Sequence, residues 1–225
     1  MTLDELVEEY SLENYKLFFG KDRHGKTINQ WFIFDNHEEY LDKYLGFYKN
    51  MEELTEAIIY ATDGFFKLSN RGVEFFIRHG HQSEYKDKKG QLKGIKPSIL
   101  SEVRNNLIRN IDVFRAVKKF DQVIEVVNSA RISGFGELAV YDTSLRIGSF
   151  LNIEPDAVYL HAGSRDGCRS LEVKGYLPTG SSELSLIHTN FLPKILQNMK
   201  PASLEHFFCA AKDRLKEITP LKFLY

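Results

Sequence analysis

The sequence predicts a mainly α-helical, multi-helix globular domain with room for one small β-hairpin or sheet. Three observations carry this prediction. Apolar residues recur three and four positions apart through most of the chain, helix-capping residues precede these runs, and period-two alternation is scarce. With 225 residues, 43% of them hydrophobic, the chain is long enough to bury one substantial core. We therefore expect a single helical domain.

The first half of this domain is expected to hold three helices, and residues 12–19 are expected to form either a further helix or a strand. Thr2 and Glu5 have the spacing of a capping box, which opens the first helix. Helical periodicity predicts two more helices over residues 37–48 and 51–68. We expect the part up to residue 96 to end in an exposed basic loop over residues 83–96, because that stretch is rich in lysine and glycine.

The second half, residues 97–225, is expected to be a helical part that contains a hairpin between two helices. Pro97 is a typical first helical residue, and a further helix follows Asp112. The remaining helices are expected over residues 121–130, 137–151, a short stretch from Pro155, 164–172 and 203–218. Residues 31–34 and 171–177 are the best strand candidates.

Composition limits the classes of function. The net charge is −1 and the pI about 6.7, so any contact with nucleic acid must be local. Cys168 and Cys209 do not form a metal-type pair, which favours a reduced, cytoplasmic protein. No apolar run approaches the roughly 18 residues that span a bilayer, so we expect no membrane partner. The oligomeric state stays open.

The most informative segment is residues 131–136, Arg-Ile-Ser-Gly-Phe-Gly, between two predicted helices. Gly134 and Gly136 accept backbone angles that a Cβ would forbid, and Phe135 can pack into the core between the helices. The N–H groups of Gly136 and the residues after it open a helix N-terminus, where the helix dipole favours an anion. The segment therefore predicts a tight turn that can hold a phosphate.

This segment resembles the helix-hairpin-helix DNA-binding motif of the DNA glycosylase superfamily. Ile132, Gly134, Phe135 and Gly136 match the motif, whereas the small residue expected one turn later is Val140. The resemblance covers roughly a fifth of the chain and implies a DNA or other nucleic-acid partner. Arg131, Lys118 and Lys119 are expected to add positive charge beside the hairpin.

The same resemblance implies a base-excision hydrolase acting in DNA repair. Asp156 lies where the family carries its catalytic aspartate, and it would stabilise an oxocarbenium-like sugar. Tyr141 and Tyr159 would stack on an extruded base. The sequence offers no lysine nucleophile at the second helix and no cysteine cluster after it. The alternative is that the two glycines form an ordinary turn between helices and that Asp156 caps a helix.

A second group of residues suits acid–base or phosphate chemistry. Asp142 and Arg146 are four residues apart, so they share one helix face and can pair. His161 and Arg165 follow in a polar segment, and both tyrosines named above would line a pocket with Arg146 and Arg165. We expect Asp142 and His161 as further catalytic candidates. The alternative is an exposed ion pair and a hydrogen-bonded histidine.

Two further sequence patterns resemble binding sites, but we predict that both are exposed turns or loops without a ligand. Residues 20–27 spell the phosphate-binding pattern GxxxxGKT, but a poor helix start follows, so an exposed turn is the simpler prediction. His79 and His81 would share one face of a strand and could share a metal ion. No carboxylate lies at a recognised ligand spacing, so we expect a solvated loop there. We therefore predict no metal site and no cofactor.

The leading hypothesis is a nucleic-acid-binding protein with a helix-hairpin-helix phosphate grip, which the resemblance extends to a DNA glycosylase-like enzyme. One alternative is a helical protein-interaction module without chemistry, which the 17 Phe and 11 Tyr residues would serve. Another alternative is an enzyme with a phosphate-bearing ligand, built around Asp142, Arg146 and His161.

Overall fold

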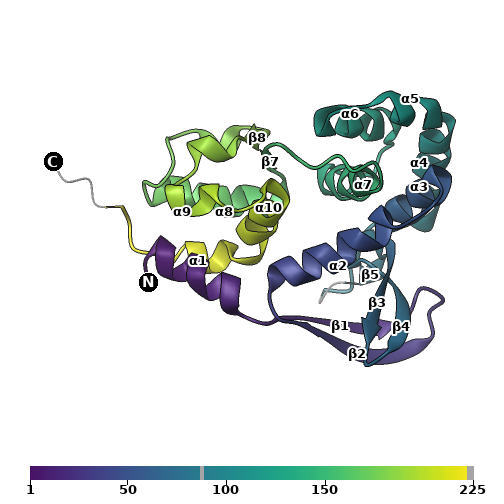
Figure 1. Cartoon of the computed structure of the whole chain (residues 1–225), viewed down its shortest axis with the longest axis horizontal. Helices are drawn as coiled ribbons and strands as arrows, with labels where there is room; N and C mark the ends of the chain where they lie inside the picture. The colour runs from purple at the N-terminus through teal and green to yellow at the C-terminus, as the bar shows by residue number, and fades with distance from the viewer. Residues whose placement is uncertain (87–88, 222–225) are drawn as a thin grey trace. The chain divides into compact units, whose positions relative to one another are not determined.

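The computed structural model describes residues 1–86 and 89–221 of the chain (Figure 1). It divides into two compact units, which we name by their place in the sequence. The terminal unit holds residues 1–15, 34–39 and those from 155 on, and the central unit holds residues 16–33 and 40–154. Each unit takes residues from both sides of position 96, so the expected subdivision into residues 1–96 and 97–225 matches neither.

The central unit begins with a hairpin formed by strands β1 (Tyr15–Lys21) and β2 (Thr27–Phe34). A connection this short allows only an antiparallel pair. The Asp22 carboxylate accepts the amides of His24 and Lys26, each at 2.9 Å, and so closes the turn. Residues 22–26 therefore form the turn of a hairpin, in line with the simpler prediction, and residues 20, 21 and 27 belong to its two strands. The segment is not the strand–loop–helix of a phosphate-binding loop.

Helix α3 (Leu54–Asp63) is followed by a second hairpin of strands β3 (Phe65–Asn70) and β4 (Val73–Arg78). Phe65 lies opposite Arg78, and Asn70 lies opposite Val73. The prediction of one helix over residues 51–68 was wrong beyond residue 63. The reason is Gly64, whose φ of +70° is the left-handed conformation that ends helices.

A third, shorter strand pair joins β5 (Tyr85–Lys86) to β6 (Leu92–Lys93). It lies in the segment that was predicted to be an exposed basic loop over residues 83–96, of which residues 87 and 88 lie outside the described residues. The short 3-10 helix Gly80–Gln82 connects β4 to this pair.

Most of the remaining central unit is helical. Helix α2 (His37–Lys49) enters it at Tyr40. Four further helices follow β6: α4 (Pro97–Arg109), α5 (Ile111–Ala116), α6 (Phe120–Ala130) and α7 (Glu137–Phe150). Both α3 and α6 pack against α7, which is buried along most of its length. The helices predicted over residues 121–130 and 137–151 are thus confirmed to within one residue at each end.

The terminal unit is also built from helices. They are α1 (Leu3–Leu12), α8 (Ala162–Val173), α9 (Lys194–Gln197), α10 (Pro201–Ala210) and α11 (Lys212–Leu215). Strands β7 (Val158–Tyr159) and β8 (Leu186–Ile187) pair antiparallel, and two 3-10 helices span Ser181–Glu183 and Thr189–Phe191. Helices α8 and α10 pack closely, and Gly167 allows this approach because it has no Cβ. A Cβ at this position would lie 2.2 Å from the Phe208 carbonyl oxygen.

Three predictions for the terminal unit were wrong. The expected strand over residues 171–177 is the last turn of α8 and the loop after it, since Leu171 is buried on the helix face that packs into the core. The expected helix from Pro155 is absent from the described residues, and strand β7 follows at Val158. The single closing helix over residues 203–218 is two helices, α10 and α11.

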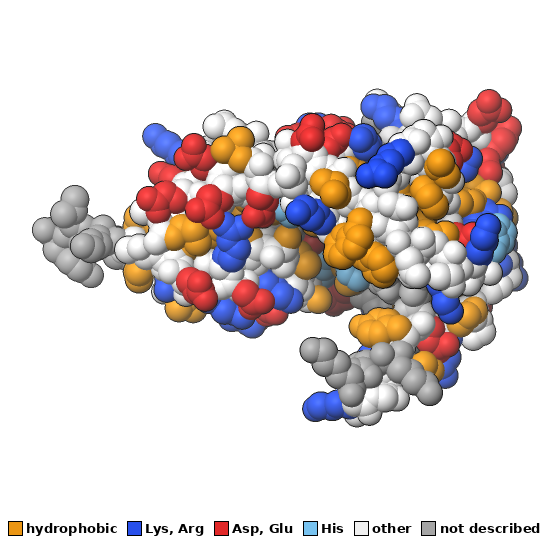
Figure 2. All heavy atoms as spheres, turned by 90° about the horizontal axis from the view of Figure 1, so that it is seen from below, with side chains coloured by type: hydrophobic (Ala, Val, Ile, Leu, Met, Phe, Trp, Pro, Cys, Tyr) orange, Lys and Arg blue, Asp and Glu red, His pale blue; other side chains and the backbone are white. Residues whose placement is uncertain are grey.

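The prediction of a helical fold with small β-hairpins is confirmed. The amount of sheet was underestimated, because the strands of the described residues form four separate two-stranded pairs. On the face that Figure 2 shows, Lys and Arg side chains alternate with Asp and Glu side chains. Within residues 1–86 and 89–221, every helix is too short or too polar to cross a membrane.

Candidate functional site

A group of polar side chains surrounds Arg146 in the central unit, and the Arg146 side chain itself is 0% exposed. Its Nε donates to the Tyr44 hydroxyl, its Nη1 donates to the Ala61 carbonyl at 2.8 Å, and its Nη2 donates to Gln82 Oε1 at 3.1 Å. The guanidinium carbon also lies 5.6 Å from the centre of the Tyr44 ring. Arg146 is thus held by α2, α3 and the segment after β4.

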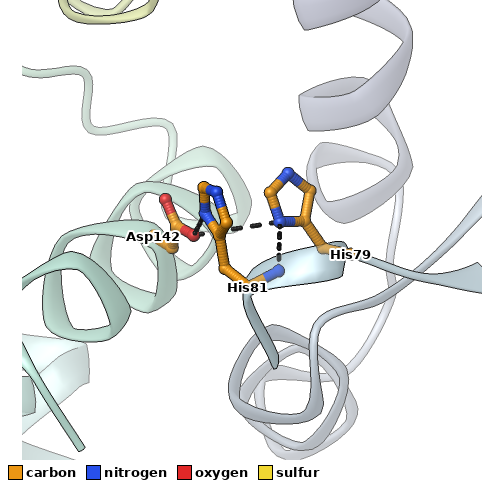
Figure 3. A group of neighbouring side chains, drawn as sticks. All are labelled: His79, His81 and Asp142. Carbon is orange, nitrogen blue, oxygen red and sulfur yellow. Dashed lines mark hydrogen bonds and ion pairs between the residues drawn. The ribbon is translucent and has the colours of Figure 1, made fainter. Parts of the chain in front are cut away.

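Asp142 lies one turn before Arg146 on α7, and its Oδ2 atom is the meeting point of three basic side chains. Arg146 Nη2 is 3.5 Å from this oxygen, His81 Nδ1 is 3.0 Å from it, and His79 Nδ1 is 4.0 Å from it. Figure 3 shows the two imidazole rings on one side of the carboxylate, both carried by the segment after β4. We call His79, His81 and Asp142 the histidine–aspartate cluster.

Local structure explains why the two histidines reach α7. The His79 amide donates to the Gly64 carbonyl at 2.7 Å, which joins the end of β4 to the end of α3. Gly64 allows this close approach, because a Cβ there would lie 2.9 Å from the Gln82 side chain. The 3-10 turn Gly80–Gln82 then places His81 against Asp142.

The charge of Asp142 is stabilised although the carboxyl group is largely buried. Burial by itself would raise the pKa of this carboxyl, but the hydrogen bond from His81 and the positive charge of Arg146 outweigh burial. The pKa of Asp142 is therefore held well below its ordinary value. The exposed fractions of the side chains are 13% for Asp142, 21% for His79 and 44% for His81, so the cluster is open to water on the histidine side.

The hairpin between α6 and α7 is a tight turn, but the expectation that both glycines need special backbone angles holds only for Gly134, because Gly136 has a φ of −77° and a ψ of 177°. The Phe135 amide donates to the Ile132 carbonyl at 3.0 Å and closes a turn, in which Gly134 has a φ of +93°. Phe135 is 2% exposed and packs into the core, whereas Gly134 and Gly136 are exposed. Gly136 caps the N-terminus of α7.

The surroundings of this hairpin differ from the prediction. A Cβ on Gly134 would lie 2.5 Å from Ile99 Cδ1, so the first turn of α4 borders the hairpin, with the exposed Lys96 as its N-cap residue. Lys118 and Lys119 are exposed but stand at the opposite end of α6, an 11-residue helix about 16 Å long. Of the predicted cations, Arg131 lies at the hairpin, as the C-cap of α6.

The other predicted site residues belong to the terminal unit. His161 is buried as the N-cap of α8, with Nε2 3.1 Å from the carboxylate of Glu205. Arg165 donates to the backbone carbonyls of Leu160, Ser182 and Leu184, which fixes the β7–β8 region.

Asp156 is exposed and Tyr159 is half-buried on β7, both in the terminal unit, whereas Tyr141 is buried on α7 of the central unit. The structure therefore brings Asp142 and Arg146 together, as their spacing predicted. His161 and Asp156 belong to a different compact unit from both.

Sequence reasoning missed the histidine–aspartate cluster and the role of Tyr44 and Gln82. His81 and Asp142 are 61 residues apart, and no local spacing relates them. The available signal is the pair His79 and His81, which can share a metal ion, but no carboxylate lies at a recognised ligand spacing from the pair in the sequence to complete a ligand set.

The chain was compared with known proteins in three ways. No protein-family model, no curated protein and no solved structure matches it.

Proposed function

We propose that the central unit binds the backbone of a nucleic acid and that the hairpin of residues 131–136 holds one of its phosphates. The observation that carries this proposal is the exposed backbone of Gly134 and Gly136 on either side of the buried Phe135. The buried ring anchors the turn, so the amides beside it are held in place before a ligand arrives. Such preorganisation lowers the entropic cost of binding.

The helix that follows strengthens the case for an anion. Helix α7 has 14 residues and begins directly after Gly136, so its first N–H groups point out at the hairpin. The positive end of the helix dipole lies at the same place. A phosphate diester offers the unpaired acceptor oxygens that these donors require.

Charge near the hairpin is modest. Arg131 and Lys96 are exposed beside it, and Glu137, in the first turn of α7, opposes them. A chain with a net charge of −1 gains little from long-range attraction of a polyanion. We therefore expect weak binding that is independent of base sequence and that falls as salt rises.

The proposal stops at binding. An aspartate that stabilises a developing cation works best in a dry site, where its charge is not screened by water. Asp156 is exposed instead, and it lies outside the central unit. Base excision at Asp156 stays a prediction, which an Asp156→Asn variant with unchanged glycosylase activity would remove.

A substitution at Gly136 tests the phosphate grip without disturbing the fold. Gly136 has a φ of −77° and a ψ of 177°, which any residue can adopt, and a Cβ there meets nothing within 4 Å. Gly136→Asp places a carboxylate where helices favour one, so α7 stays stable, but the carboxylate repels phosphate and competes for the amides. Gly136→Ala is the matched neutral control.

The measurement is fluorescence anisotropy of labelled single- and double-stranded DNA at low salt. We expect wild-type protein and Gly136→Ala to bind alike, Gly136→Asp to bind at least about tenfold more weakly, and Arg131→Ala to lie between them. Equal binding by wild type and Gly136→Asp would place the contact elsewhere. No binding by wild type at low salt would end the proposal.

A further inference from the structure

We propose that the histidine–aspartate cluster binds one divalent transition-metal ion of the zinc type, through Nδ1 of His79, Nδ1 of His81 and Oδ2 of Asp142. These three atoms lie within 4.8 Å of one another. Two imidazoles and one carboxylate are a donor set that zinc and ferrous iron both accept, and three protein ligands leave further positions for water. This inference is independent of the proposed nucleic-acid binding.

The distances are close to those that an ion requires. Metal–ligand bonds of about 2.0–2.2 Å place neighbouring ligand atoms about 3.0–3.5 Å apart. His81 Nδ1 and Asp142 Oδ2 are 3.0 Å apart already, and His79 Nδ1 and the same oxygen are 4.0 Å apart. His79 Nδ1 also accepts from the His81 amide at 3.5 Å, so binding an ion requires this nitrogen to leave that amide and approach the carboxylate oxygen.

The backbone of both histidines is anchored in the fold. The His79 amide is bonded to the Gly64 carbonyl, and its ring lies 5.7 Å from the ring of Tyr44. His81 follows in the 3-10 turn, and its ring centre is 4.6 Å from that of His79. The two rings are thus neighbours before an ion arrives, and the exposed side of the cluster admits the ion and its water.

Arg146 orients the carboxylate. Its Nη2 lies 3.5 Å from the oxygen that faces the histidines, and its other nitrogens are tied to Tyr44 and Ala61. Partners behind a ligating carboxylate commonly fix its direction in this way. The positive charge of Arg146 also repels a cation, so the affinity is lower than the same three ligands would give without it.

The competing explanation is an ion-pair network that only neutralises Arg146. Asp142 alone supplies the one negative charge that Arg146 needs, and the other donors of Arg146 are bonded to Tyr44, Ala61 and Gln82. The hydrogen bond from His81 to Asp142 belongs to such a network, and it stabilises the carboxylate. His79 Nδ1 lies 4.0 Å from the same oxygen, beyond hydrogen-bonding distance, and an ion accounts for this second imidazole beside the first.

The experiment uses full-length protein without a histidine tag, stripped with a chelator and then titrated with Co²⁺, whose visible absorption reports its ligands. The variants are His79→Ala and His81→Ala, which leave Asp142 and Arg146 paired in the core. His188→Ala, an exposed histidine of the terminal unit, is the matched control. The thermal midpoint of each protein is measured with and without Zn²⁺, since an ion that binds the folded state raises it.

We expect wild type and His188→Ala to bind one Co²⁺ per chain, with a ligand-field band that excess Zn²⁺ displaces, and to melt at a higher temperature with Zn²⁺. We expect each cluster variant to bind at least tenfold more weakly and to lose the thermal shift. Absence of stoichiometric binding by wild type would overturn the proposal. So would binding of unchanged strength and spectrum by the double variant His79→Ala/His81→Ala.

Discussion

Among the described residues, Arg146 is one of the largest side chains that are fully buried, and Asp142 supplies the opposite charge beside it. A buried ion pair contributes little net stability, but removal of one partner leaves an uncompensated charge in the core. The spacing of Asp142 and Arg146 predicted that they pair. The interpretation of this pair as an exposed one was wrong, because Arg146 is 0% exposed. The four-residue spacing predicts only that the two side chains share one face of α7. The burial of Arg146 depends on α2 and α3, which contact its side chain.

We therefore expect Asp142→Ala to lower the free energy of unfolding by about 3–5 kcal/mol, because it leaves the guanidinium unpaired in the core. Asp112→Ala removes an ion pair with Arg115 in which both side chains are largely exposed, and it is expected to change stability by less than about 1 kcal/mol. Urea unfolding followed by circular dichroism measures both. Equal losses in the two variants would show that Arg146 does not depend on Asp142.

The two cysteines differ in reactivity for a physical reason. Cys168 is 0% exposed on α8, and burial, together with the charge of Glu172, raises its pKa to about 12. Only the thiolate is alkylated rapidly, so Cys168 is expected to be inert at pH 8. Cys209 is partly exposed.

Iodoacetamide followed by peptide mass spectrometry is therefore expected to label Cys209 in the folded protein and both cysteines in urea. If Cys168 were labelled as fast as Cys209 without denaturant, its side chain would not be buried on α8 as the structure has it. A Cys209→Ser variant is the control, since its remaining thiol isolates the signal of Cys168.

At the scale of elements, helices and turns are predicted correctly from the sequence where they depend on residues close together in the chain. Helices α6 and α7 and the turn between them depend on periodicity and on two glycines, all within about thirty residues, and their bounds were predicted closely. The prediction that the helix continues beyond residue 63 failed because the structure there depends on contacts that are not local. Phe65, Phe66 and Leu68 continue the helical spacing, but β3 pairs with β4, and tertiary pairing decides a short apolar run.

The two glycines of the hairpin provide a matched pair for a test of this element. Gly134 has a φ of +93°, and a Cβ there would meet Ile99 at 2.5 Å, whereas a Cβ at Gly136 meets nothing within 4 Å. Gly134→Ala is expected to lower the free energy of unfolding by about 1–3 kcal/mol, because of backbone strain and overlap. Gly136→Ala is expected to stay within about 0.5 kcal/mol of wild type. Similar losses in thermal or urea unfolding would refute the turn geometry.

At the scale of the whole molecule, the two compact units were not visible in the sequence. Domain boundaries are usually recognised by polar or glycine-rich linkers. Here the chain passes between the units at the start of β1, at the end of β2, within α2 and after residue 154. Three of these four positions lie inside regular structure, so composition does not change there, and a single domain was the natural expectation.

The terminal unit consequently depends on contacts between distant segments, and His37 makes several of them. Its ring stacks on Tyr10 with centres 3.9 Å apart and lies 5.1 Å from the ring of His206. Its Nε2 is 3.2 Å from the Glu13 carboxylate. His37 thus joins residues 1–15, 34–39 and those from 155 on. Loops that link such segments are long, so their closure costs conformational entropy that these contacts must offset.

Acid is therefore expected to weaken the terminal unit. Burial lowers the pKa of His37, and the charge of Arg214 lowers it further, whereas the hydrogen bond and charge of Glu13 raise it; the net shift is downward. In the unfolded chain His37 takes up a proton near pH 6.5, so below that pH the unfolded state binds more protons and stability falls. His37→Gln removes this proton uptake and leaves His206 in place. Urea unfolding at pH 7.5 and at pH 5.5 measures the effect. The free energy of unfolding should fall less between these two pH values in His37→Gln than in wild type. Equal falls in the two proteins would show that His37 is not buried in its neutral form.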